Sequence, residues 1–284
     1  MDGRYREGDH LLGIAGLALL RAGAQRRLDA VGRHAAEIAT IARRLEEPAY
    51  ARRRDLPEYG VQAGYAGWAE RYDDPGNDTI GLEQPLVRAL LDDLPAGGPV
   101  LDAACGTGRH AAYLAGIGRE VIGVDSSEEM LARARAKLPQ ADLRAGDLAA
   151  LPVAGGSCAG AVCALALSHL DQLGPAVAEL ARVLRPGGRL VISNPHPFAT
   201  GVLGWRAVFV DAAGARRMIP EYAHLHGDYV EALTAAGLVV RRLLEPGLTR
   251  RQARARAKGD HAEAFEEALT GVPAVIVWEA ERPA

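Results

Sequence analysis

The chain has 284 residues, of which 49% are hydrophobic and 24% are charged, with a formal net charge of −3. This length allows a substantial core, and this composition excludes a disordered or fibrous protein. The small negative charge provides no basic field for nucleic acid, and the three cysteines have neither disulfide nor zinc-ligand spacing. We expect one large domain with an appendage, no nucleic-acid partner and a reducing, cytoplasmic environment.

Residues 1–58 are predicted to form a helical segment. Asp9 precedes an apolar run over 11–20 and is expected to cap the first helix. That run is too short to cross a membrane, so we expect a buried helix and no membrane partner. A second helix is predicted over 25–46, before Pro48, with one narrow apolar stripe. We expect the stripe to pack within the protein; a homodimer contact or a cap over a substrate pocket are the alternatives.

An aromatic segment follows at residues 59–72, although aromatic residues make up only 5% of the chain. Tyr65, Trp68 and Tyr72 are spaced i, i+3 and i+7, which places them on one face of a helix. The spacing leaves open whether that face packs into the core or covers a bound ligand.

Short apolar strands and helices alternate from residue 83 onward, which predicts a parallel sheet between two helical layers. The predicted helices cover 83–94, 108–117, 127–137, 174–184 and 228–236, and the predicted strands cover 100–104, 120–124, 141–145, 159–166, 188–193, 238–243 and 274–279.

Residues 100–111, VLDAACGTGRHA, have the pattern of a strand, a glycine turn and a helix start. Gly106 and Gly108 lack a Cβ, so the turn can bend sharply and a ligand can approach the backbone. Such a corner is typical of nucleotide-cofactor sites. Asp102, before the glycines, would repel a pyrophosphate and attract an ammonium group. Asp125 ends the next strand and can accept hydrogen bonds from two ribose hydroxyls, a role that several nucleotide cofactors share.

Four motifs in this order resemble those of class I S-adenosylmethionine-dependent methyltransferases, in the branch that acts on small molecules. They are LDAACGTG at 101–108, GVDSS at 123–127, AGDL at 145–148 and LRPGG at 184–188. Two features depart from the family pattern: Cys158-Ala159 stands where many relatives carry Phe-Asp, and residues 198–225 exceed a minimal connection. The resemblance implies a Rossmann-like, doubly wound α/β fold over 59–284, with a mostly parallel seven-stranded sheet and a C-terminal antiparallel strand.

The resemblance also implies S-adenosylmethionine as the cofactor. The backbone from Ala104 to Gly108 would line its methionine part, Asp102 would face the ammonium group, and Asp125 would hold the ribose. Asp147 would accept from the adenine amine, with Leu148 beside the ring, and Ser126 is also expected to cap the following helix. The expected cofactor-binding residues are Tyr65, Tyr72, Asp102, Ala104, Gly106, Gly108, Asp125, Ser126, Asp147, Leu148 and Leu165.

The implied reaction is methyl transfer to an oxygen, nitrogen or carbon atom of a small molecule, such as a secondary metabolite. A base matters only if the nucleophile must lose a proton. His169 falls at the carboxyl end of the fourth strand of the alternation and is the first candidate base; alternatively it only shapes the pocket. His196, after the fifth strand, is the second candidate.

An insertion near 198–226 is predicted to form a β-hairpin, with strands at 205–210 and 216–222 and a turn at 211–214. Its place after the fifth strand favours a substrate lid over a decorative insertion. His224 and His226 share one face of an extended chain, but no third ligand is evident, so no metal site is expected. The expected substrate-binding residues are Trp68, His224, His226 and Tyr229.

Two alternatives belong to other functional classes. An NAD-dependent oxidoreductase is disfavoured by Asp102 and by the AGDL and LRPGG elements. A binding protein with this fold would hold S-adenosylmethionine without methylating anything, and turnover of the cofactor distinguishes it from an enzyme.

Overall fold

The computed structural model describes residues 4–74, 77–211, 213–257 and 259–284 and divides the chain into two compact units. The first unit comprises Met1–Glu58 and Pro246–Pro273, and the second comprises Tyr59–Glu245 and Ala274–Ala284. The sequence indicates the boundary after Glu58, but it does not indicate that residues 246–273 group with the N-terminal helices.

Helix α1 (Glu7–Ala24) is the centre of the first unit and packs against α2 (Leu28–Arg43) and α11 (Ala262–Leu269). The expected cap is wrong: the helix starts two residues before Asp9, after Arg6, whose guanidinium donates to the Asp9 carboxylate. Among the described residues, no helix combines the length and apolar character that a membrane crossing needs. The unit also contains α3 (Pro48–Ala51), α10 (Arg250–Ala255) and the antiparallel strands β1 (Arg4–Arg6) and β2 (Arg53–Asp55).

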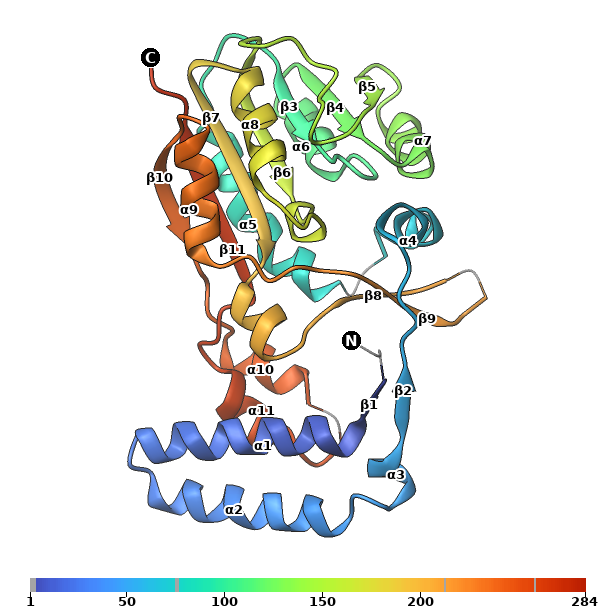
Figure 1. Cartoon of the computed structure of the whole chain (residues 1–284), viewed down its shortest axis with the longest axis vertical. Coiled ribbons are helices and arrows are strands. Elements are labelled where there is room, and N and C mark those ends of the chain that lie inside the picture. Colours follow the sequence, from blue (N-terminus) through green and yellow to red (C-terminus); the bar gives the residue numbers. More distant parts are fainter. Residues whose placement is uncertain (1–3, 75–76, 212, 258) are drawn as a thin grey trace. The chain divides into compact units, whose positions relative to one another are not determined.

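The second unit is built on a seven-stranded sheet with the order β10-β11-β7-β6-β3-β4-β5 (Figure 1). Strand β11 is antiparallel to both of its neighbours, whereas β7, β6, β3, β4 and β5 are mutually parallel. This confirms the predicted Rossmann-like fold. The strands are β3 (Val100–Ala103), β4 (Val121–Asp125), β5 (Asp142–Ala145), β6 (Cys158–Ala164), β7 (Leu184–Pro195), β10 (Val239–Leu244) and β11 (Val275–Glu281).

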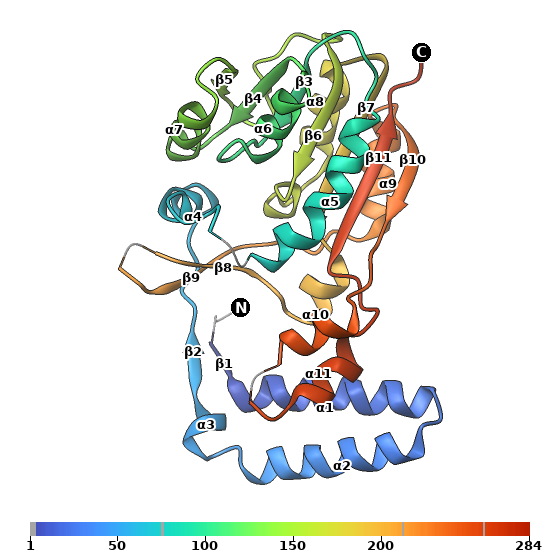
Figure 2. The same cartoon turned by 180° about the vertical axis from the view of Figure 1, so that it is seen from behind.

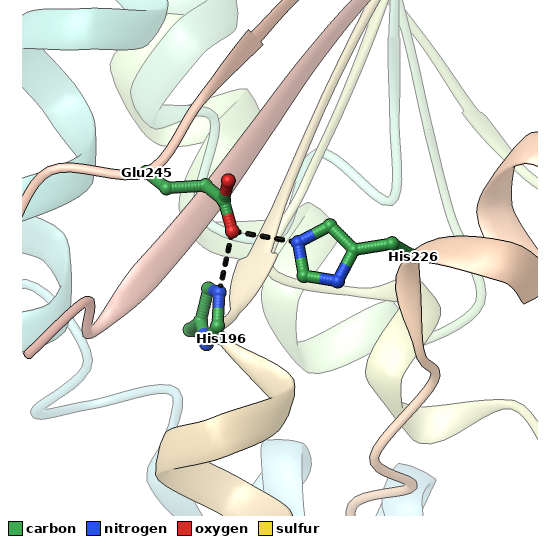
Figure 3. A group of neighbouring side chains, drawn as sticks. All are labelled: His196, His226 and Glu245. Carbon is green, nitrogen blue, oxygen red and sulfur yellow. Dashed lines mark hydrogen bonds and ion pairs between the residues drawn. The ribbon is translucent and has the colours of Figure 1, made fainter.

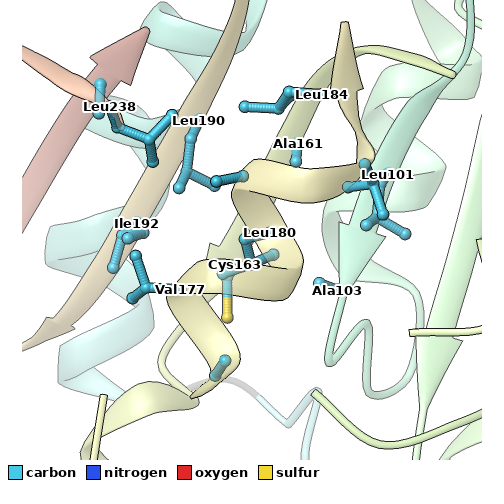
Figure 4. Packing of buried hydrophobic residues seen from close by; sticks show 14 of the residues in the cluster. Leu101, Ala103, Ala161, Cys163, Val177, Leu180, Leu184, Leu190, Ile192 and Leu238 are labelled. Carbon is cyan, nitrogen blue, oxygen red and sulfur yellow. The ribbon is translucent and has the colours of Figure 1, made fainter. Parts of the chain in front are cut away.

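Alternating side chains of the central strands supply two cores, one on each face of the sheet. On one face, Leu101, Ala161 and Ile192 pack with α8 and α9 (Figure 4). On the other face, Val100 and Val162 pack with α5 and α6, whose side of the sheet is seen in Figure 2. The helices of this unit are α4 (Val61–Trp68), α5 (Asp78–Asp92), α6 (Arg109–Gly116), α7 (Glu128–Lys137), α8 (Gly174–Val183) and α9 (His226–Ala235).

The predicted hairpin is present as the antiparallel pair β8 (Ala207–Val210) and β9 (Arg216–Ile219). Both strands are shorter than expected. The Asp211 carboxylate accepts from the backbone N–H groups of Ala213 (3.0 Å) and Ala215 (2.9 Å), which closes the turn. Ala212 of the predicted turn lies outside the described residues. Short helical turns at Leu167–His169 and Phe198–Val202 follow β6 and β7.

Candidate functional site

A cavity lies at the carboxyl ends of strands β3, β4 and β6, where the strand order reverses around β3. Two non-glycine residues in its wall, Ala104 (φ 55°) and Leu165 (φ 56°), have left-handed backbone conformations. Such conformations are uncommon for residues with a Cβ and concentrate at functional sites. The described wall consists of Val61, Gln62, Tyr65, Tyr72, Ala104, Gly106, Val124, Asp125, Ser126, Ser127, Met130, Gly146, Asp147, Leu148, Ala164, Leu165, Ala166, His169 and Leu170.

Asp125 is fixed by the backbone on both sides of it. Its Oδ2 accepts from the N–H of Gly106 at 2.7 Å, and its Oδ1 accepts from the N–H of Ser127 at 2.8 Å. Burial raises the pKa of this carboxyl group. Each carboxylate oxygen can accept more than one hydrogen bond, so the side chain can still receive two hydroxyl groups from a ligand. The cap of α7 is Ser127, which accepts from Met130 N–H at 3.3 Å; the expectation of Ser126 as that cap is wrong.

Asp147 and Leu148 follow β5 on the cavity wall. The Oδ1 of Asp147 accepts from the N–H of Ala149 at 2.8 Å, which holds the carboxylate in a tight turn. Gly146 precedes it because a Cβ there would lie 2.6 Å from Pro152 Cδ and 3.0 Å from Val124 Cγ1. The close packing of this turn therefore requires glycine.

Asp102 and Gly108, both predicted to bind cofactor, are not part of the described cavity wall. Asp102 is buried, and its Oδ2 accepts from the N–H of Ala111 at 2.7 Å. Burial raises its pKa to about 6. Gly108 has φ 79° immediately before α6 and lies against Ala134. Asp102 therefore bonds to the first turn of α6, and Gly108 allows the turn to pack closely against α7.

Tyr65 and His169 meet within the cavity. The Tyr65 Oη and the His169 Nε2 are 2.7 Å apart, and the His169 Nδ1 lies 2.7 Å from the carbonyl oxygen of Pro220. A carbonyl can only accept, so Nδ1 carries the proton and Nε2 accepts from the Tyr65 hydroxyl. Burial lowers the pKa of His169 and raises the pKa of Tyr65 well above its ordinary value. Both groups are therefore neutral near pH 7.

Aromatic contacts join α4 to the hairpin beside the cavity. The Trp68 ring stacks on Phe209 of β8, with centroids 5.6 Å apart, and also contacts Tyr65 and Tyr72. Gly64 of α4 lies so close to Ile219 of β9 that a Cβ would be 2.7 Å from its Cγ1. Trp68, predicted to bind substrate, is not part of the described wall and instead connects α4 with the hairpin.

The remaining predicted residues also lie outside the described wall. His224 Nε2 donates to the carbonyl of Leu170, a wall residue, at 2.7 Å. Tyr229 is buried, with its ring stacked on Trp278 at 5.4 Å. His196 and His226 both contact Glu245.

Several wall residues were missed by the sequence-based prediction. Gln62 lies three residues before Tyr65, so the helical spacing that identified the aromatic face also identifies it. Leu170 directly follows His169. Val124, Ser127, Gly146, Ala164 and Ala166 lie beside predicted residues at or just after strand ends, whereas Val61 begins α4 and Met130 lies in the first turn of α7.

Residues 101–192 match the family model of a methyltransferase domain. A demethylmenaquinone methyltransferase of Beutenbergia cavernae is 39% identical over 144 residues, which cover 49% of this chain and 60% of that protein. An uncharacterised methyltransferase of Emericella nidulans is 30% identical over 216 residues, which cover 62% of this chain and 74% of that protein.

A crystal structure of an S-adenosylmethionine-dependent methyltransferase from Mesorhizobium loti is similar, with a TM-score of 0.54 and 27% sequence identity. The similarity covers 70% of this chain and 97% of that chain. The chain spans less than two thirds of the Beutenbergia protein. The similarity therefore identifies the methyltransferase domain but does not identify the molecule that accepts the methyl group.

Proposed function

Because the chain belongs to the class I S-adenosylmethionine-dependent methyltransferases, we propose that it methylates an oxygen, nitrogen or carbon atom of a small molecule, with His169 as the base. The observation that carries this proposal is that Asp125 and the hydrogen-bonded pair of Tyr65 and His169 line the same cavity. Asp125 would bind the cofactor, and the Tyr65–His169 pair would accept a proton at the same edge of the sheet.

The residues of the cavity fit the cofactor. Asp125 has acceptor capacity for a ribose, and Asp147 is available to the adenine amine. A Cβ built on Gly106 meets nothing within 4 Å, so the backbone there is open to the methionine part. Aromatic faces and acidic groups suit a sulfonium cation, and the described wall contains neither lysine nor arginine. S-adenosylmethionine, when bound, supplies a methyl group on a good leaving group.

The protein's own contribution is alignment and proton transfer. Holding nucleophile and methyl donor in line is worth about 7–11 kcal/mol in favourable cases. An acceptor O–H or N–H that donates to Tyr65 Oη would pass its proton to that oxygen while the Tyr65 proton moves to His169 Nε2. The resulting imidazolium would keep its Nδ1–H bonded to the Pro220 carbonyl. General bases positioned in this way typically contribute 10²–10⁴-fold in rate.

A small acceptor is favoured by the cover that α4 and the β8–β9 hairpin make beside the cavity. The same proposal places the reaction in the cytoplasm, consistent with three buried free cysteines, and involves no nucleic-acid or membrane partner. A homodimer stays a prediction.

Calorimetric titration with S-adenosylhomocysteine, with NAD in a parallel titration, tests the cofactor assignment. We expect micromolar affinity for the first ligand and none for the second. A panel of small phenols, amines and acidic carbon compounds is then incubated with S-adenosylmethionine, and S-adenosylhomocysteine formation is measured. Binding without turnover across such a panel would favour the non-methylating alternative.

A further inference from the structure

Three potential metal ligands converge outside the cavity wall: His196, His226 and Glu245 (Figure 3). The Oε1 atom of Glu245 lies 2.8 Å from the Nε2 of His196 and 2.6 Å from the Nε2 of His226. The three ligand atoms all lie within 4.8 Å of one another. In the sequence, His226 is paired with His224. In the structure, it lies instead beside His196 and Glu245, which are distant from it along the chain.

Three separate elements hold these side chains. His196 follows the end of β7, His226 is the first residue of α9, and Glu245 directly follows β10. The His196 side chain is 6% exposed, whereas those of His226 and Glu245 are 43% and 35% exposed. A buried ligand beside two partly exposed ligands provides both a fixed anchor and a path from solvent.

We propose that His196, His226 and Glu245 form a binding site for a divalent transition-metal ion of the zinc type. Two imidazole nitrogens and one carboxylate oxygen are a donor set that such ions prefer over magnesium or calcium. Zinc–ligand bonds of about 2.0–2.2 Å place tetrahedral ligand atoms about 3.3 Å apart, so the observed atoms need only small movements. Three protein ligands leave a fourth position for water on the exposed side.

Metal binding must replace three hydrogen bonds of the metal-free protein: one that His196 accepts from the Phe198 N–H, and one between Glu245 and each of the two histidines. The N–H of Phe198 donates to the Nδ1 of His196 at 3.1 Å, so the Nε2 of this neutral ring carries its proton and donates to Glu245. On coordination through Nε2 that proton moves to Nδ1, and the Phe198 contact is released. Each of these hydrogen bonds contributes far less to stability than zinc coordination, so the three metal–ligand bonds together favour the metal-bound form.

The test uses untagged, chelator-treated full-length protein titrated with Zn²⁺ by calorimetry and with Co²⁺ by visible absorption. We expect one equivalent to bind, with a Co²⁺ spectrum of low coordination number. His226→Ala and Glu245→Gln alter partly exposed residues and should keep the fold, which circular dichroism checks. Each should weaken binding by at least about tenfold, because even partners of metal ligands contribute 10–100-fold.

His224→Ala is the matched control, because His224 lies two residues before His226 but bonds to the Leu170 carbonyl instead. It should bind Zn²⁺ like the wild type. The proposal is overturned if the wild type binds no stoichiometric Zn²⁺ or Co²⁺. It is equally overturned if His226→Ala and Glu245→Gln retain wild-type affinity, or if only His224→Ala loses it. These measurements need no methyl acceptor, so they are independent of the proposed function.

Discussion

The strand-end part of the cavity wall and the cover made by α4 and the β8–β9 hairpin are held in place in different ways. The strand-end part of the wall lies at the carboxyl ends of neighbouring strands, and backbone N–H groups hold its carboxylates Asp125 and Asp147 in place. The cover comes from α4 and the β8–β9 hairpin, which are far apart along the chain and are joined by ring stacking and side-chain packing. Substitution of Asp125 or Asp147 removes the acceptor of these backbone hydrogen bonds, whereas substitution in the cover removes ring or side-chain contacts. The two regions should therefore respond differently to substitution.

His169→Ala should have the largest effect, and it should change the rate of methyl transfer without changing cofactor affinity. Removing the base is expected to lower the rate of methyl transfer by about 10²–10⁴-fold, with little change in S-adenosylhomocysteine affinity. Rates are measured with an acceptor from the panel, and affinity by calorimetry. His261→Ala, which alters a histidine of the first unit bonded to Glu37, is the control. An unchanged rate would leave His169 as a residue that only shapes the pocket.

Asp125→Ala should have the opposite effect, because it should mainly weaken the affinity for the cofactor. Hydrogen bonds to a charged group are each worth about 1.5–3 kcal/mol, so losing two ribose contacts predicts binding of S-adenosylhomocysteine weaker by about 10²–10⁴-fold. Asp142→Ala, at an exposed carboxylate paired with Arg144 on β5, is the matched control. If calorimetry finds equal affinity in the folded variant, Asp125 does not hold the ribose.

The pH dependence of kcat/KM should report His169. A base must be unprotonated, so the rate rises as pH increases through the pKa of His169 and is level above it. Burial lowers that pKa from 6.5, so the midpoint of the rise should lie below pH 6.5. In His169→Ala this rise should disappear from the residual activity. A midpoint well above 6.5 in the wild type would exclude neutral, buried His169 as the titrating group.

Phe209→Leu should have the smallest effect. Replacing one ring of the Trp68–Phe209 stack by an aliphatic side chain is expected to destabilise the protein by about 1 kcal/mol. It should raise KM for the acceptor while S-adenosylhomocysteine affinity stays as in the wild type. Thermal unfolding and the two titrations check this together. If the binding of acceptor and of S-adenosylhomocysteine weakened equally, the cover and the strand-end wall would have to be structurally coupled.

Most of the second unit could be predicted because its strands are short apolar runs separated by glycine turns and helices. The ends of β3, β4 and α7 differ from the predicted ones by a single residue. The place of residues 246–273 could not be predicted, because the apolar face of α11 does not specify that α1 covers it. Likewise, the sequence identified Tyr65 and His169 as separate candidates, but their contact spans 104 positions.

Glu245 could not be identified as a potential metal ligand from sequence motifs. It is a glutamate just after an edge strand, and no neighbouring residue gives it a special spacing. Its possible chemistry depends on two histidines that arrive from other elements. The sequence search for a third ligand near His224 and His226 could not find it.

The group that orients His169 is the main-chain oxygen of residue 220, and every amino acid has such an oxygen. Side chains of the hairpin can therefore be randomised without deleting the acceptor that fixes the imidazole tautomer. Substitutions in the hairpin then change its side-chain surface while the His169 imidazole keeps its hydrogen bond to residue 220. Under the proposed function, the β8–β9 hairpin is therefore the place for a library aimed at new methyl acceptors.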